Sequence, residues 1–190
     1  MPSLPPTTIT VDGLAVPVEV AGTETGSVVV LLTAAQQPLT AYAAVCERLH
    51  TASLKTVVLS PDPRLTAKAV IGVLDQLDVR WSLLVGDRLG AELAWELAAT
   101  RLDRFTGLVV IDRGHPRVAD LSGMIRDEHC PPVELNTTAL VSTSAARAVA
   151  KAGQRFVYGD YRIVDLLSRR NAADSTAQLA AEIVMRTSTW

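Results

Sequence analysis

The sequence predicts an α/β fold, with a mostly parallel central sheet of about eight strands and helices on both faces. Short apolar runs alternate with helical patterns from residue 28 onward, as expected when strands and helices follow one another in βαβ units. Several runs, such as SVVVLLT at 27–33, are continuous and β-branched, which indicates strands buried on both faces. The length of 190 residues and the hydrophobic fraction of 48% suit a single domain over residues 1–190.

The predicted elements follow in chain order. TTITVDG and VPVEVAG are expected to form a hairpin around Asp12-Gly13, a dipeptide that favours tight turns. Later strands are expected at 27–33, 54–60, 81–86, 105–112, 138–143 and 161–167. Helical patterns lie at 41–50, at 67–77, after Gly90, at 145–152 and from about 175 to 187. RFVYG, at 155–159, fits either a strand or a loop.

Three helices have recognisable start signals. Thr40 and Thr66 are expected to cap the first two, because a threonine hydroxyl can accept a hydrogen bond from a free N–H of the first turn. Ser175 and Gln178 fit a capping box at the start of the last helix.

The stretch 113–137 interrupts the alternation and is expected to be irregular, because it contains several prolines. Its one amphipathic piece, VADLSGMI, is expected to pack Val118, Leu121 and Ile125 on the core.

Composition and motifs exclude several kinds of partner and cofactor. The net charge of −2, with Lys and Arg spread along the chain, gives no nucleic-acid surface. No apolar run approaches about 20 residues and MPSLPPTTIT lacks signal-peptide features, so we expect no membrane contact and a cytoplasmic location. Cys46 and Cys130 are expected as free thiols. The sequence has neither a dinucleotide fingerprint nor a P-loop, so we expect no cofactor and no metal.

The stretch SLLVGDRLGAELAWELAA, residues 82–99, indicates a sharp strand-to-helix turn. The apolar run ends at Gly86, the helical pattern begins after Gly90, and Arg88 stands at the centre of the turn. Such a turn brings the strand and helix backbones together, which requires small residues at its flanks. The leucines at positions 89, 93 and 97 are expected to lie on one stripe of the helix.

The order of elements over about residues 7–187 resembles the α/β-hydrolase fold, and VGDRLGAELAWELAATRLDRFTGLVVID is its most specific match. The resemblance implies that Arg88 takes the place of the nucleophile and that Thr33-Ala34 takes the place of the oxyanion-side motif. It implies that the backbone N–H groups of Ala34 and Leu89 point into one pocket. It also implies that residues 113–137 stand where the family carries its cap, here reduced.

The resemblance also locates the two other triad positions. The acid is expected after the seventh strand, where the sequence reads Thr143-Ser-Ala-Ala146, and the base after the eighth, where it reads Ser168-Arg-Arg-Asn171. The two turns contain neither a carboxylate nor a histidine, and no histidine follows His129 anywhere in the sequence. A Ser-His-acid site needs an imidazole to accept the nucleophile's proton. All three triad positions are therefore expected to be replaced.

Several candidate roles remain for residues near the turn. Arg88 either clamps a carboxylate or phosphate of a ligand, or forms a structural salt bridge to Asp112, Asp87 or another carboxylate. Asp112 is expected to pair with an arginine. His115 with Asp112 or Cys130 is the remaining candidate for a relocated catalytic dyad.

The sequence therefore favours a non-catalytic protein that binds a small anionic ligand or a protein partner at the former active-site pocket, with Arg88, Leu89, Ala34, Thr33 and Asp112 as candidate binding residues. One alternative is a hydrolase with atypical catalytic residues within 112–130. The other is a structural protein that forms a homo-oligomer.

Overall fold

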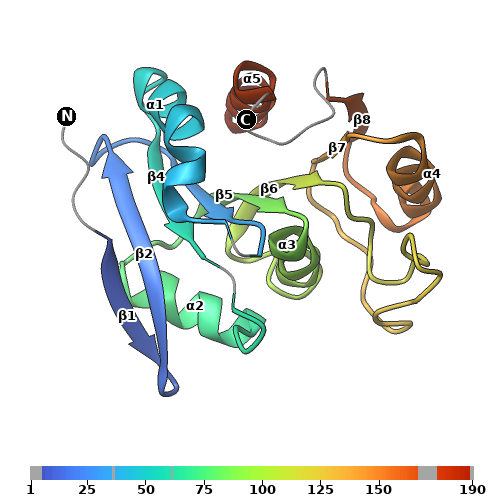
Figure 1. The fold of residues 1–190 in the computed structure, drawn as a ribbon, viewed down its shortest axis with the longest axis horizontal. Helices are drawn as coiled ribbons and strands as arrows, with labels where there is room; N and C mark the ends of the chain where they lie inside the picture. The colour runs from blue at the N-terminus through green and yellow to red at the C-terminus, as the bar shows by residue number, and fades with distance from the viewer. Residues whose placement is uncertain (1–5, 36, 61, 167–174, 189–190) are drawn as a thin grey trace.

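The computed structural model describes residues 6–35, 37–60, 62–166 and 175–188, which form one eight-stranded sheet between two layers of helices (Figure 1). The strand order is β1-β2-β4-β3-β5-β6-β7-β8. The strands are β1 (Thr7–Val11), β2 (Leu14–Gly22), β3 (Val28–Leu32), β4 (Lys55–Leu59), β5 (Ser82–Asp87), β6 (Phe105–Ile111), β7 (Thr137–Val141) and β8 (Tyr161–Asp165). β2 pairs antiparallel with β1 and β4, and the other neighbours are parallel. The predicted α/β fold with a mostly parallel sheet is confirmed.

The helices are α1 (Ala43–Thr51), α2 (Ala67–Gln76), α3 (Leu89–Thr100), α4 (Ser144–Gly153) and α5 (Thr176–Thr187), with short 3-10 helices η1 (Leu39–Tyr42) and η2 (Gln154–Phe156). α1 and α5 cover one face of the sheet, and α2, α3 and α4 cover the other (Figure 1). None of these helices is long and apolar enough to cross a bilayer, in the part of the chain that the structure describes.

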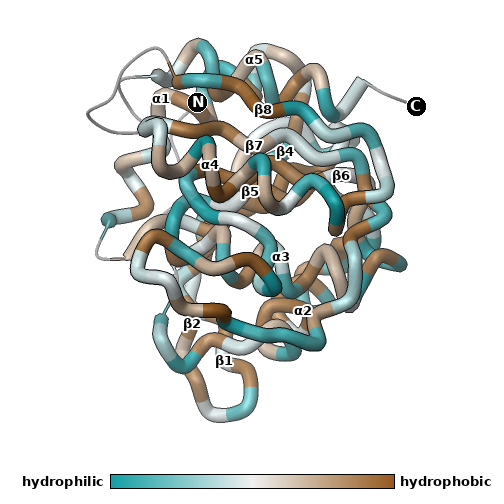
Figure 2. Tube along the Cα trace, turned by 90° about the vertical axis from the view of Figure 1, so that its right-hand side faces the viewer, coloured by the Kyte–Doolittle hydropathy of each residue, from teal (hydrophilic) through white to brown (hydrophobic). Residues whose placement is uncertain are grey.

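The central strands are apolar throughout because successive side chains enter two different cores. In β3, Val29 and Leu31 pack with the α1 and α5 layer, whereas Val30 and Leu32 pack with the α2, α3 and α4 layer. Figure 2 shows the consequence, with hydrophobic segments in the interior and polar ones in many outer loops. The prediction from the run SVVVLLT is therefore confirmed.

The topology brings two predicted site segments together. β3 lies between β4 and β5, so the chain leaves β3 in one direction toward β4 and reaches β5 on the other side. At the carboxyl ends of these strands, Leu32 pairs with Gly86. Such a reversal of strand order is where parallel sheets usually offer a ligand site. It places Thr33 and Ala34 beside the turn that follows β5.

The start signals of the helices are confirmed in part. The Thr66 hydroxyl accepts a hydrogen bond from Ala69 N–H at 3.1 Å, so the predicted cap of α2 is correct. Thr40 lies inside η1 and does not cap α1, because the chain makes a 3-10 turn before the α-helix begins. The capping box of α5 is also wrong: Ser175 makes no N-cap side-chain hydrogen bond, and Gln178 Nε2 donates to the Asp165 carbonyl.

Of the three leucines on the predicted stripe of α3, only Leu97 is fully buried in the core. Ala91, Ala94, Trp95 and Ala98 form the fully buried face with Leu97, and Leu89 and Leu93 are half-buried at the edge. Small side chains are needed on the inner face because α3 lies close against the end of β5.

The segment from Asp112 to Asn136 links two parallel strands without a helix, as the prolines predicted. It runs over the sheet face covered by α3 and α4 and is referred to below as the crossover segment (Figure 1). Val133 makes an isolated bridge to Val157, so the ambiguous stretch RFVYG forms η2 and this bridge. Parallel strands usually require a helix for such a connection, and here buried side chains such as Val133 cover the sheet instead.

The predicted stripe on VADLSGMI is wrong except at Val118. Val118 is buried, whereas Leu121 and Ile125 are 60% and 42% exposed. The Asp120 carboxylate accepts the backbone N–H groups of Ser122 and Met124, which turns the chain where a helix was expected. Three apolar side chains therefore face outward: those of Leu121, Met124 and Ile125.

Gly86 and Gly90 are required by the close approach of α3 to β3 and β5. A Cβ at Gly90 would lie 2.0 Å from the Leu32 carbonyl oxygen, and a Cβ at Gly86 would lie 2.5 Å from Ala91 Cα. Because the clashing atoms belong to the backbone, the conflict cannot be removed by a change of rotamer. The requirement for small residues at the flanks of the turn is confirmed.

We therefore expect Gly90→Ala to lower the free energy of unfolding by about 3 kcal/mol or more. Gly153→Ala is the matched control, because its Cβ would lie 3.7 Å from the nearest atom, and we expect a change within about 1 kcal/mol. Urea titration of the two variants measures both values. Equal stability of the two variants would contradict the close approach.

Candidate functional site

The turn after β5 has a strained backbone at its apex. Arg88 adopts φ 50° and ψ −106°, a conformation that residues with a side chain rarely take. Its N–H donates to the Ile111 carbonyl at 3.1 Å, and its own carbonyl accepts the N–H of Glu92. The apex is therefore held by β6 on one side and by α3 on the other. Strain of this kind persists only where the surrounding structure fixes it.

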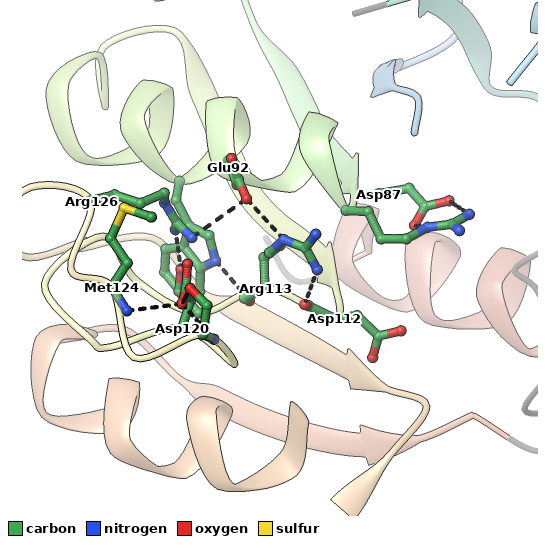
Figure 3. Close-up of polar contacts among 11 residues, drawn as sticks. Asp87, Glu92, Asp112, Arg113, Asp120, Met124 and Arg126 are labelled. Carbon is green, nitrogen blue, oxygen red and sulfur yellow. Dashed lines mark hydrogen bonds and ion pairs between the residues drawn. The ribbon is translucent and has the colours of Figure 1, made fainter. Parts of the chain in front are cut away.

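The Arg88 side chain forms an internal ion pair with its neighbour Asp87 (Figure 3). Nε lies 3.1 Å from Oδ1 and Nη2 lies 3.3 Å from Oδ2. The Asp87 carboxylate is 2% exposed, whereas the Arg88 side chain is 40% exposed. The hydrogen bonds to Asp87 raise the pKa of the guanidinium above its ordinary value. Arg88 was expected to bind a ligand or to form a structural salt bridge. The salt bridge is confirmed, with Asp87 as the partner.

Tyr42 completes this buried network, and sequence reasoning missed it. Its hydroxyl donates to Asp87 Oδ2 at 2.5 Å and accepts the backbone N–H of Ala34 at 3.2 Å. Burial, followed by the charge of Asp87, raises the pKa of the phenol, so Tyr42 is protonated at neutral pH. Nothing in the run AYAAVCERLH distinguishes this tyrosine from an ordinary core residue.

The predicted oxyanion-side residues are occupied by internal partners. Thr33 is fully buried, and both its backbone N–H and its hydroxyl donate to the Leu59 carbonyl. The N–H of Ala34 is bonded to Tyr42. The other donor of the expected pair is the N–H of Leu89. It lies in the first turn of α3, where the helix itself provides no acceptor for it.

Asp112 does not pair with an arginine side chain among the described residues, so that prediction is wrong. Its carboxylate accepts two hydrogen bonds from Ser142, at 2.7 Å from the backbone N–H and 2.5 Å from the hydroxyl. The positive φ of 55° at Asp112 directs the chain away from β6 there. Ser142, which follows β7, then supplies the donors that an arginine was expected to supply. The charge of Asp112 nevertheless contributes to the raised pKa of Arg88.

His115 is a structural residue of the crossover segment. The ring is fully buried, stacked on Phe156 and edge-on to Trp95. Nε2 lies 2.9 Å from the Pro131 carbonyl oxygen, and Nδ1 accepts the N–H of Arg117 at 3.2 Å. These bonds require a neutral ring with its proton on Nε2, and burial lowers the pKa accordingly. Both nitrogens are engaged, so the predicted dyad with Asp112 or Cys130 does not form.

Cys46 and Cys130 are free thiols, as predicted, and both are buried. Burial raises the pKa of the Cys130 thiol to about 11 and that of Cys46 to about 11. A nucleophilic cysteine needs a lowered pKa, because the thiolate is the reactive form. Cys130 therefore lacks the activation that a catalytic role would require.

Glu92 fixes the crossover segment to α3 (Figure 3), and no sequence pattern predicted this role. Its carboxylate lies 2.9 Å from Arg113 Nε and 3.8 Å from Arg126 Nη1. The two arginines also donate to carbonyl oxygens of the crossover segment, Arg113 to that of Asp112 and Arg126 to that of Gly114. One carboxylate thus organises two cations beside the turn between β5 and α3 around Arg88, which we call the elbow.

A pocket of about 250 Å³ lies between α3, the loop before α2 and the crossover segment. Its lining consists of Asp62, Pro63, Leu65, Leu89, Glu92, Leu93, Glu96, Pro116, Arg126, Asp127 and Cys130. Arg88 is not among these residues, although the pocket begins at the next residue of the chain. The described residues include no group of three or more His, Cys, Asp or Glu side chains that could hold a metal ion.

The Tyr42–Asp87 contact predicts a specific response to alkaline pH. The folded pKa of Tyr42 is raised, so the unfolded chain releases this proton near pH 10 while the folded chain retains it. The resulting stabilisation is present below pH 10 and is lost as the pH rises further, at up to about 1.4 kcal/mol per pH unit. We expect Tyr42→Phe to lower the free energy of unfolding by about 1–3 kcal/mol at pH 8. Above pH 10 its stability should fall less steeply than that of the wild type.

Denaturant titrations at pH 8, 10 and 11, roughly spanning the tyrosine range, measure this response. Tyr158→Phe, which removes an exposed phenol, is the control and should match the wild type at pH 8. Parallel pH profiles for Tyr42→Phe and the wild type would argue against the buried phenol–carboxylate contact.

Comparisons with solved structures give close matches over nearly the whole chain. An epoxide hydrolase from Vigna radiata, VrEH1, has a TM-score of 0.76 at 11% identity, covering 97% of this chain and 98% of that chain. A hydrolase from Pseudomonas aeruginosa PA01 has a TM-score of 0.76 at 15% identity, with the same coverage of 97% and 98%. Est1E from Butyrivibrio proteoclasticus has a TM-score of 0.74 at 11% identity, covering 98% and 100%.

No protein-family model matches the sequence, and a comparison with curated proteins finds no match either. Identities of this size carry information about the fold and not about the reaction. The strand order, the strained turn after β5 and these structural neighbours agree with one another. The chain has the α/β-hydrolase fold.

Proposed function

We propose that this chain is a binding protein that retains the α/β-hydrolase frame but does not carry out Ser-His-acid hydrolysis. The observation that carries the proposal is the ion pair of Arg88 with Asp87 at the apex of the elbow. A guanidinium has no lone pair with which to attack a carbonyl carbon and stays charged at physiological pH. The neighbouring Ala34 N–H is likewise held by Tyr42 instead of being free for an oxyanion.

The remaining triad positions support the same proposal. Thr143 caps α4 with its hydroxyl, which accepts the N–H of Ala146, and the acid is not provided there. The turn 168–171 lies outside the described residues, and its sequence contains no histidine. His50 is on α1, with Nε2 2.9 Å from the Thr56 hydroxyl, and His115 is enclosed by aromatic rings. Neither imidazole is placed to accept a proton at the elbow.

As the ligand we propose a small organic anion, held by the outer edge of the Arg88 guanidinium. Asp87 engages Nε and Nη2, and the described residues provide no hydrogen-bond acceptor for Nη1. The side chain is 40% exposed, so a carboxylate or phosphate can approach this edge, with the Leu89 N–H as a second donor. The ion pair with Asp87 fixes the guanidinium in place before a ligand arrives.

The two alternatives have unequal support. A hydrolase that uses Asp112, His115 or Cys130 is not favoured, because the carboxylate and the imidazole are hydrogen-bonded elsewhere and the thiol has a raised pKa. An oligomer-forming role has the exposed side chains of Leu121 and Met124 in its favour. The molecular mass, measured over a range of protein concentrations, tests this alternative. The oligomer-forming role predicts a dimer, and a monomer at all concentrations rules it out.

Two measurements test the proposal. A fluorophosphonate probe and short-chain esters should give neither labelling nor turnover, because the elbow carries no activated hydroxyl. In thermal shift assays, hexanoate, benzoate or inorganic phosphate should stabilise the wild type, by about 2.7 kcal/mol at a concentration of 100 Kd. Arg88→Gln should lose this stabilisation, measured against its own ligand-free midpoint.

Arg101→Gln is the matched control, because Arg101 also forms an ion pair with a nearby aspartate, Asp103, but lies at the opposite end of α3 from the elbow. It should respond to the anions as the wild type does. Reproducible labelling by the fluorophosphonate would overturn the non-catalytic role. Equal responses of the wild type and Arg88→Gln would overturn the anion site alone.

A further inference from the structure

The pocket beside α3 is a separate feature from the elbow. One wall is a single stripe of α3, formed by Leu89, Glu92, Leu93 and Glu96, which recur at the spacing that places helix residues on one face. The loop before α2 and the crossover segment form the other walls. This geometry explains why two leucines of α3 are half-buried and do not enter the core.

The inner lining of the pocket is apolar. Leu65, Leu89, Leu93 and Pro116 contribute hydrocarbon, and the buried thiol of Cys130 completes this surface. The thiol has no hydrogen-bond partner among the described residues, although the side chain is 2% exposed. A volume of about 250 Å³ lies just below the range of pockets that hold drug-sized ligands, so a small molecule fits best.

Most of the charged groups around this lining are carboxylates. The ion pairs show which of these carboxylates already have a cationic partner. Asp62 is paired with Arg64, and Glu92 is paired with Arg113 and Arg126.

Two other carboxylates of the lining, those of Glu96 and Asp127, have no ion pair within the described part of the chain. One oxygen of Asp127 accepts the N–H of His129. After burial, the charges of Asp127 and Glu96 are the next causes of the raised pKa of the Cys130 thiol, so both act on the inner wall.

We propose that this pocket binds a small organic cation, an ammonium or guanidinium group on a short apolar chain. The cationic group lies beside Glu96 and Asp127, where it replaces water as the partner of two unpaired carboxylates. The apolar chain covers Leu89 and Leu93 and removes their exposed surface from water. Glu92 pairs with both Arg113 and Arg126, which leaves one positive charge there, but the two unpaired carboxylates of Glu96 and Asp127 outweigh it.

This site differs from the proposed anion site in both charge and position. Arg88 does not line the pocket, and none of the pocket carboxylates pairs with it. The two proposals can therefore fail independently. Loss of cation binding leaves the role of Arg88 unaffected, and loss of anion binding leaves the pocket unaffected.

The test uses n-hexylammonium as the probe, with hexanoate and hexanol as comparison ligands of the same chain length. Isothermal titration calorimetry gives the affinities, and amide chemical shifts identify the site. We expect hexylammonium to bind more tightly than hexanol and to shift the amides of Leu93, Glu96 and Cys130. Glu96→Gln/Asp127→Asn should bind it at least about tenfold more weakly, and Arg88→Gln should bind it as the wild type does.

Glu24→Gln/Glu47→Gln is the matched control, because it removes the same charge from exposed positions away from the pocket. If the Asp127 substitution disturbs its loop, Glu96→Lys on the exposed surface of α3 gives the same answer, since a reversed charge should abolish binding. Binding that is absent, equal for hexylammonium and hexanol, or unchanged in Glu96→Lys overturns the proposal. Amide shifts confined to the elbow would overturn it as well.

Discussion

The buried carboxylate of Asp87 is the constraint on which the centre of the molecule depends. A charge that is 2% exposed is tolerated only when its oxygens are fully paired. Arg88 and Tyr42 supply that pairing, and in doing so they connect the ends of β3 and β5 with η1 and the start of α3. Arg88 is held in its strained conformation by this pairing and by the N–H bond to Ile111. The elbow is thus stabilised by the ion pair of Asp87 with Arg88 and by the hydrogen bond from Tyr42.

A second carboxylate, Glu92, organises the neighbouring region by the same physics. The crossover segment has no helix with which to cover the sheet, so specific contacts fix its path. Glu92 holds two arginines, Arg113 and Arg126, whose remaining donors satisfy carbonyl oxygens of the segment (Figure 3). His115 fills the space between Trp95 and Phe156. Irregular chain can stay buried here because its polar groups have partners.

The periodicity of apolar residues and the turn-forming residues predicted the strands, helices and their order. This was possible because they act through local geometry, as do the Asp12-Gly13 hairpin and the glycines at 86 and 90. Contacts between distant residues could not be predicted. Tyr42 reaches Asp87 across 45 positions of the chain, and Asp112 meets Ser142 across 30. No local pattern marks either pair. The predicted cap at Thr40 is wrong for a related reason. The 3-10 turn η1 contains Thr40 and places Tyr42 beside Asp87, so α1 begins only at Ala43.

The positions of the charges also explain how one short helix can border the two proposed sites. At the elbow, the N-cap residue Arg88 offers a cation and the first turn of α3 offers N–H groups, and both suit an anion. One and two turns later the same helix presents Glu92 and Glu96, and the outward stripe becomes acidic and apolar. Glu92 is neutralised by Arg113 and Arg126, which separates the two regions. A molecule with both an acidic and a basic group would therefore meet complementary charge along the first turns of α3.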